Sequence, residues 1–126
     1  MKIPKFEAQT EWVKPTEFPD LRKVDEIAID LETKDPDLLK KGSGSVIGNG
    51  EVIGIAVATK HYKGYFPIAH EGGGNMDRSR VLSWLKDILE STSTKVFHNA
   101  IYDVCWLRAM GFKINGDIAC TMIASA

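Results

Sequence analysis

Apolar and polar positions along the chain predict five β-strands. Residues 27–32 alternate between apolar and polar side chains, which is typical of a strand with one buried face. Residues 52–59 are almost continuously apolar and predict a strand in a sheet covered on both faces. Pro67 cannot donate to a central ladder, so we expect residues 65–68 to form an edge strand that makes a hairpin with the strand before it. Two further short strands are expected at residues 95–98 and 117–119.

Two helices are predicted after the third strand. Asp77 is suited to the N-cap of the first helix. The apolar stripe of that helix recurs at helical spacing and consists of Val81, Leu82, Leu85, Ile88 and Leu89. Asn99 is suited to the N-cap of a second helix over residues 100–110, which Gly111 ends. This order predicts an α/β fold, a mixed five-stranded sheet flanked by helices, with the fourth strand beside the first and a third helix beginning near the end of the chain.

Length and composition indicate one globular domain. The chain has 126 residues, of which 44% are hydrophobic and 26% charged, and these values exclude a disordered or collagen-like protein. Residues 1–25 contain three prolines and no clear period, so we expect an irregular lead-in packed on the domain. The net charge of −1 excludes a protein that coats nucleic acid by charge alone, although it permits nucleic acid that is gripped locally.

Several local signals argue against other functions. No apolar run reaches the roughly 18 residues that cross a bilayer, and the N-terminus lacks a secretory signal, so we expect an intracellular protein without a membrane partner. Cys105 and Cys120 lack a C-x-x-C spacing and are expected to be reduced core residues. The glycine-rich stretch 42–50 is expected to be a flexible loop, and the three histidines have no zinc spacing and are expected on the surface or packed.

Two acidic clusters carry the candidate chemistry. Asp30 and Glu32 share one face of the first strand, with Cα atoms about 6.5–7 Å apart, and such close carboxylates repel unless a cation or proton lies between them. Asn99 and Asp103 share one face of the first turn of the second helix. Because their strands are expected to be neighbours, the two clusters should converge. The alternatives are a solvated strand end and a helix start in which Asn99 only caps and Tyr102 packs in the core.

The two clusters also resemble a known family. Residues 27–33 resemble the first exonuclease motif, and residues 99–103 the second, of the 3′–5′ exonucleases of the DEDD superfamily, which have four metal-binding acidic residues. The resemblance is to the proofreading exonuclease domain of family A DNA polymerases, phage-type examples in particular. Residues 65–70 and 121–122 are also similar to stretches of that domain. The resemblance implies a ribonuclease H-like fold from about residue 27 onward.

The resemblance implies hydrolysis of phosphodiester bonds at 3′ ends of single-stranded DNA with two Mg²⁺ or Mn²⁺ ions. Asp30 would bridge both ions, Glu32 would hold the ion that carries the nucleophilic water, and Asp103 would hold the second ion. Substrate-binding roles are implied for three further residues, namely Thr33, Asn99 and Tyr102. Ordinary core packing remains the alternative for the tyrosine.

The chain departs from the family in one respect. The family has a third motif, Tyr-x-x-x-Asp or His-x-x-x-Asp, and no such pattern follows Asp103; Asp117 is acidic but is expected to be a turn residue. We therefore expect a C-terminally incomplete domain that lacks the final helices, works with the remainder of a polymerase or exonuclease chain in bacterial or phage-infected host cytoplasm, and self-associates through uncovered sheet surface. An exoribonuclease of the same superfamily and a catalytically incompetent nucleic-acid-binding fragment remain alternatives.

Overall fold

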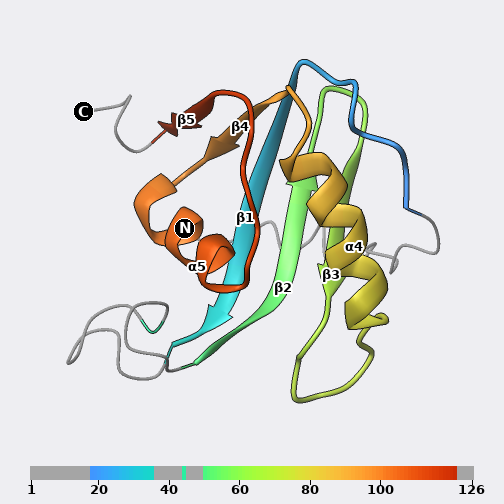
Figure 1. Ribbon diagram of the computed structural model, residues 1–126. Coiled ribbons are helices and arrows are strands. Elements are labelled where there is room, and N and C mark those ends of the chain that lie inside the picture. The colour runs from blue at the N-terminus through green and yellow to red at the C-terminus, as the bar shows by residue number, and fades with distance from the viewer. Residues whose placement is uncertain (1–17, 36–43, 45–49, 122–126) are drawn as a thin grey trace.

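The computed structural model describes residues 18–35, 44 and 50–121, which form a mixed five-stranded sheet and two helices (Figure 1). The strand order is β3-β2-β1-β4-β5. The strands are β1 (Glu26–Lys34), β2 (Glu51–Ala58), β3 (Lys63–Pro67), β4 (Thr94–Phe97) and β5 (Ile118–Cys120), and the helices are α4 (Arg78–Leu89) and α5 (Ala100–Ala109). Strands β1, β2 and β3 pair antiparallel, whereas β4 pairs parallel with both β1 and β5. The predicted fold class is confirmed.

The predicted N-caps of the two helices are also confirmed. The Asp77 side chain accepts hydrogen bonds from the first backbone N–H groups of α4, and the Asn99 side chain accepts one from the backbone of Tyr102 in α5. Pro67 lies in β3, at the edge of the sheet, as predicted. No helix in the described part of the chain is long and apolar enough to cross a membrane.

One face of the sheet carries the hydrophobic core. The alternating residues Ile27, Ile29 and Leu31 of β1 are buried together with the apolar stripe of α4, which lies over β2 and β3 in Figure 1. The end of the lead-in joins this core, because Leu21 is buried and the indole N–H of Trp84 donates to the carbonyl of Pro19 at 2.7 Å. Pro19 and Leu21 of the expected lead-in therefore contact the rest of the domain, whereas residues 1–17 lie outside the described residues.

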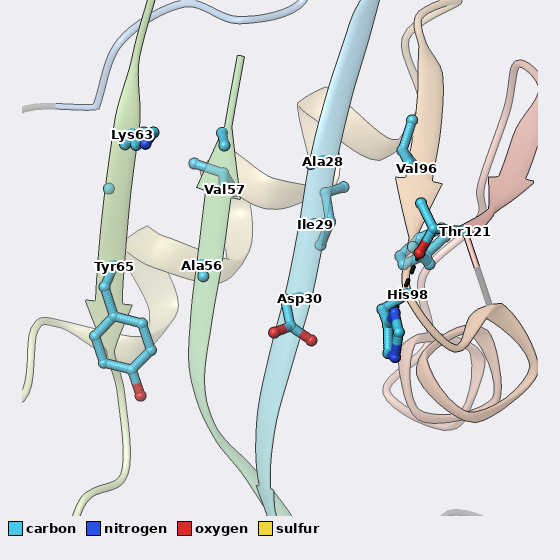
Figure 2. Close-up of a pocket in the computed structure, with 13 residues that line it drawn as sticks. Ala28, Ile29, Asp30, Ala56, Val57, Lys63, Tyr65, Val96, His98 and Thr121 are labelled. Atoms are coloured by element: carbon cyan, nitrogen blue, oxygen red, sulfur yellow. Dashed lines mark hydrogen bonds between the residues drawn. The ribbon is translucent and has the colours of Figure 1, made fainter. Parts of the chain in front are cut away.

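The opposite face of the sheet differs from the expectation that β2 is covered on both faces. Within the described residues, Ala28, Ala56, Ala58 and Val96 of this face line an open cavity of about 500 Å³. Figure 2 looks onto this face and labels Ala28, Ala56 and Val96 on three neighbouring strands. Their side chains are small, so their partial exposure leaves little apolar area in water. An apolar run in the sequence therefore reports low polarity on both faces but does not show that both are covered.

Candidate metal centre at the end of the central strand

Asp30 and Glu32 lie in the second half of β1 and share the face opposite the core. Residues two apart in a strand face the same way, and Asp30 pairs with Ala56 and Glu32 with Gly54 in the neighbouring strand. The register shifts between Glu32 and Thr33, which is a β-bulge or similar irregularity, and β1 continues past its predicted end to Lys34. Such irregularities redirect the side chains next to them.

Asp103 approaches this pair from α5. Helix α5 begins directly after β4, which runs parallel to β1, and Asp103 occupies the first helical turn. The residue is buried, with 4% of its surface exposed. Burial, and secondly the charge of Asp30, raise the pKa of Asp103 from its ordinary value of 3.8 to about 7. The structure therefore brings these two carboxylates within electrostatic reach of each other.

Asp30 interacts with both of the other acidic residues. Burial of its carboxyl group is the main cause that raises the pKa of Asp30, the charge of Glu32 raises it further, and the charge of His98 opposes the rise. His98 is exposed, as expected, but it lies beside the site, and its Nδ1 is 3.1 Å from the hydroxyl of Thr121 (Figure 2). Asp30 is thus the residue that links the two acidic clusters.

The donor chemistry of the three carboxylates suits a hard cation. Oxygen ligands favour Mg²⁺ or Mn²⁺. A dication between Asp30 and Asp103 would oppose both causes of the raised pKa of Asp103, first its burial and then the charge of Asp30. No three His, Cys, Asp or Glu side chains in the described ranges lie close enough together to hold one ion. The residues fit a divalent cation by their chemistry, and the described part of the chain supplies an incomplete ligand set.

Sequence reasoning did not identify the hydrogen-bond partner of Glu32. The hydroxyl of Tyr65 donates to Oε1 of Glu32 at 2.7 Å, and Nε2 of His70 lies 2.5 Å from the same hydroxyl. Burial, and then the hydrogen bond to Glu32 and its charge, raise the pKa of Tyr65. The tyrosine therefore keeps its proton at neutral pH and acts as a donor. The sequence marked residues 65–70 only as part of a resembling stretch.

The three predicted substrate residues fall into two groups. Thr33 and Tyr102 form a hydrogen bond between their hydroxyl groups at 2.8 Å, and the Tyr102 hydroxyl donates to Oδ2 of Asp35 at 2.8 Å. Asn99, in contrast, is engaged as the N-cap of α5. Sequence reasoning missed Asp35, which also accepts from the backbone N–H of Gly44 at 3.0 Å. The substrate-binding roles themselves stay predictions.

Comparisons with known proteins identify the family of this chain. A family model described as 3′–5′ exonuclease matches residues 16–126, which include every predicted site residue. A DNA-directed DNA polymerase of Pseudomonas phage M6 is 37% identical in an alignment of 109 positions that covers 82% of this chain and 16% of that polymerase. The chain therefore spans less than a fifth of this relative. Because the family model covers most of the chain, the protein belongs to the 3′–5′ exonuclease domain family of family A DNA polymerases.

Proposed function

We propose that this chain belongs to a proofreading exonuclease that removes nucleotides from 3′ ends of single-stranded DNA. Membership of the 3′–5′ exonuclease family supports the removal of nucleotides from 3′ ends. The similarity to part of a phage DNA polymerase supports a longer polymerase chain as the partner. The observation that carries the proposal is electrostatic. Asp30 interacts both with Glu32 on its own strand and with Asp103 on α5, as expected of a residue that bridges two cations.

The proposed roles follow from these positions. Asp30 would be the shared ligand, Glu32 would hold one cation and Asp103 would hold the other. When bound, the two divalent ions would activate a water and stabilise the leaving 3′ oxygen. Asp103 has a pKa of about 7, so its carboxyl group must lose a proton before it can bind a cation. Cation binding is therefore coupled to proton release and is favoured above neutral pH.

Thr33 and Tyr102 are proposed to position the substrate strand. They lie just beyond Glu32 in the chain and on the first turn of α5, respectively, and their hydrogen-bonded hydroxyl groups join these two elements. Asp35 fixes the tyrosine from the other side. This connection keeps the end of β1 and the start of α5 together, so that a nucleotide held by either residue would lie near Asp30 and Asp103.

The test is the substitution Asp30→Asn in a polymerase chain that contains this sequence. Degradation of 5′-labelled single-stranded DNA is followed in Mg²⁺ and in Mn²⁺. We expect a nearly complete loss of exonuclease activity, because one carboxylate serves both cations, and an unchanged fold, because the substitution removes a repelling charge. Asp117→Asn, at an exposed position, is the matched control and should retain activity. An Asp30→Asn variant that keeps most of the activity would contradict the assignment.

Two alternatives have distinct outcomes in the same assay. An exoribonuclease would degrade RNA faster than DNA of the same sequence, because it would recognise the 2′-hydroxyl. A module that binds nucleic acid without cleaving it is favoured by the incomplete ligand set in the described residues. The 126-residue chain alone lacks the third motif, and loss of an oriented general base costs about 10²–10⁴ in rate. Comparison of this chain with the polymerase chain separates binding from catalysis.

A further inference from the structure

Tyr65 reaches Glu32 across the middle strand of a three-strand ladder. Tyr65 in β3 pairs with Ala56 in β2, which pairs with Asp30 in β1, so these three residues form one row on the open face, and Figure 2 shows Tyr65 and Asp30 at its two ends. Glu32 lies in the next row, where its partner is Gly54. The tyrosine ring therefore crosses β2 diagonally to place its hydroxyl 2.7 Å from Oε1 of Glu32.

Gly54 provides the space that this crossing requires. A Cβ atom at Gly54 would lie 1.8 Å from the hydroxyl oxygen of Tyr65 and 2.4 Å from Cζ of its ring. The backbone of Gly54 is outside the left-handed region, so alanine is compatible with its conformation. The close approach of the tyrosine ring is therefore what a side chain at position 54 would prevent.

His70 holds the other side of the tyrosine hydroxyl. The hydroxyl proton is used in the hydrogen bond to Glu32, so His70 donates its Nε2–H to the tyrosine oxygen, at a distance of 2.5 Å. The backbone of His70 is fixed in turn by the side chain of Asn75, which accepts from its N–H at 2.8 Å and donates to its carbonyl at 3.0 Å. A continuous series of hydrogen bonds thus runs from the loop after β3 to Glu32.

We propose that Tyr65 and His70 are positioning residues that hold the Glu32 carboxylate in the orientation its metal-binding role requires. This inference rests on the proposed function. The Glu32 side chain is 55% exposed, so without these bonds it would sample several rotamers. The bond from Tyr65 engages one carboxylate oxygen and fixes the direction of the other. Partners that orient a metal ligand typically contribute about 10–100-fold to metal affinity or activity.

The test compares two independent ways of breaking the Tyr65–Glu32 bond in the polymerase chain that contains this sequence. Tyr65→Phe removes only the hydroxyl, and Gly54→Ala displaces an intact tyrosine. We expect each to lower the exonuclease rate about tenfold and to raise the Mg²⁺ concentration that gives half-maximal rate. Gly72→Ala is the matched glycine control, because a Cβ there would meet nothing within 4 Å, and it should leave the rate and the Mg²⁺ dependence unchanged.

A conservative pair at position 70 tests the second step. His70→Gln keeps an N–H donor on the side chain and should therefore retain a higher exonuclease rate than His70→Ala. If His70 only filled space, the rate of the glutamine variant would not exceed that of the alanine variant. Thermal melting shows whether Tyr65→Phe or Gly54→Ala unfolds the protein. If either does, the pair at position 70 still tests whether these hydrogen bonds position Glu32. Equal rates for the glutamine and alanine variants, both at the wild-type level, would overturn the role of His70.

A double-substitution cycle separates this inference from the proposed function. In a Glu32→Gln background, Tyr65→Phe should cause no further loss, because the tyrosine acts only through Glu32. The rates are measured in Mn²⁺ with excess enzyme in single turnovers. If Glu32→Gln abolishes activity while Tyr65→Phe and Gly54→Ala match the wild type, positioning is refuted and the proposed function stands. If Glu32→Gln keeps full activity, the proposed site is wrong and this inference falls with it.

Discussion

Asp103→Asn should stabilise the metal-free protein, and the gain should depend on pH. The substitution replaces a buried carboxyl group with a neutral group of the same size. In the folded chain the pKa of Asp103 is raised to about 7, above its ordinary value of 3.8, chiefly by burial and then by the charge of Asp30. Well below pH 4 the group is protonated in both the folded and the unfolded chain. Between pH 4 and 7 only the unfolded chain loses the proton readily, so the folded state loses stability as the pH rises.

The size of the effect follows from the two pKa values. A tenfold change in proton affinity corresponds to about 1.4 kcal/mol, so the rise from 3.8 to about 7 corresponds to about 4 kcal/mol of unfolding free energy. Asparagine has no proton to lose. The free energy of unfolding of Asp103→Asn should therefore match the wild type near pH 4 and exceed it by up to this amount at pH 8. Water reaching the buried group reduces the observed value.

Urea unfolding followed by circular dichroism between pH 4 and 8, in buffer without divalent cations, measures this difference. Asp117→Asn, at an exposed position, is the control and should show no comparable gain. Addition of Mg²⁺ at pH 8 should stabilise the wild type, because a cation that binds only the folded state stabilises it, and should have little effect on Asp103→Asn. A stability difference between Asp103→Asn and wild type that is the same at pH 5 and pH 8 would refute the electrostatic account of Asp103.

Two further predictions concern residues that join elements. Lys95→Met should lower the free energy of unfolding by about 3 kcal/mol in urea titrations. The fully buried Lys95 ammonium donates to the carbonyl groups of Ser91 and Asn115, which would lose this partner. Lys86→Met, at an exposed position, is the control and should cost far less. Tyr102→Phe removes the hydroxyl that bonds to Thr33 and should lower the free energy of unfolding by about 1 kcal/mol in the same titrations. It should also raise the KM for single-stranded DNA more than it lowers kcat. An unchanged KM would contradict substrate positioning by Tyr102.

The sequence predicted the elements whose signals are local. In β1 each side chain faces away from its neighbours, so alternation alone separates the buried Ile27 and Ile29 from the exposed Asp30 and Glu32. The N-cap Asn99 is equally local, because it contacts a backbone group only three residues away. Such features need no knowledge of the rest of the fold.

Strand β4 shows where local pattern fails. Each face of the predicted strand carries one apolar and one polar side chain, Phe97 with Lys95 and Val96 with His98, so alternation does not decide which face is buried. The structure buries Lys95 and leaves Val96 only half-buried. The partners of the Lys95 ammonium are carbonyl oxygens at the end of α4 and in the segment before β5, and Asn115 is 20 residues away. The burial of this lysine depends on tertiary contacts that no local period contains.

The candidate site divides in the same way. The Asp30 and Glu32 pair follows from strand period, and the approach of Asp103 follows from the adjacency of β1 and β4. The bond between Tyr65 and Glu32 instead requires the register of three strands and a glycine at the crossing point. Residues 33 positions apart meet there. Resemblance to a family identified the stretch, but only the structure connects the tyrosine to the carboxylate.

The two faces of β1 explain how repelling carboxylates are kept together. Ile27 and Ile29 are fully buried in the core, and the same backbone carries Asp30 on the opposite face. Packing on the core face therefore fixes where Asp30 lies, and the cap at the start of α5 fixes where Asp103 lies. The raised pKa of Asp103 shows that this placement opposes folding. The core offsets that cost in the metal-free chain, and a divalent cation bound between the carboxylates would remove it, so that metal binding and stability are linked.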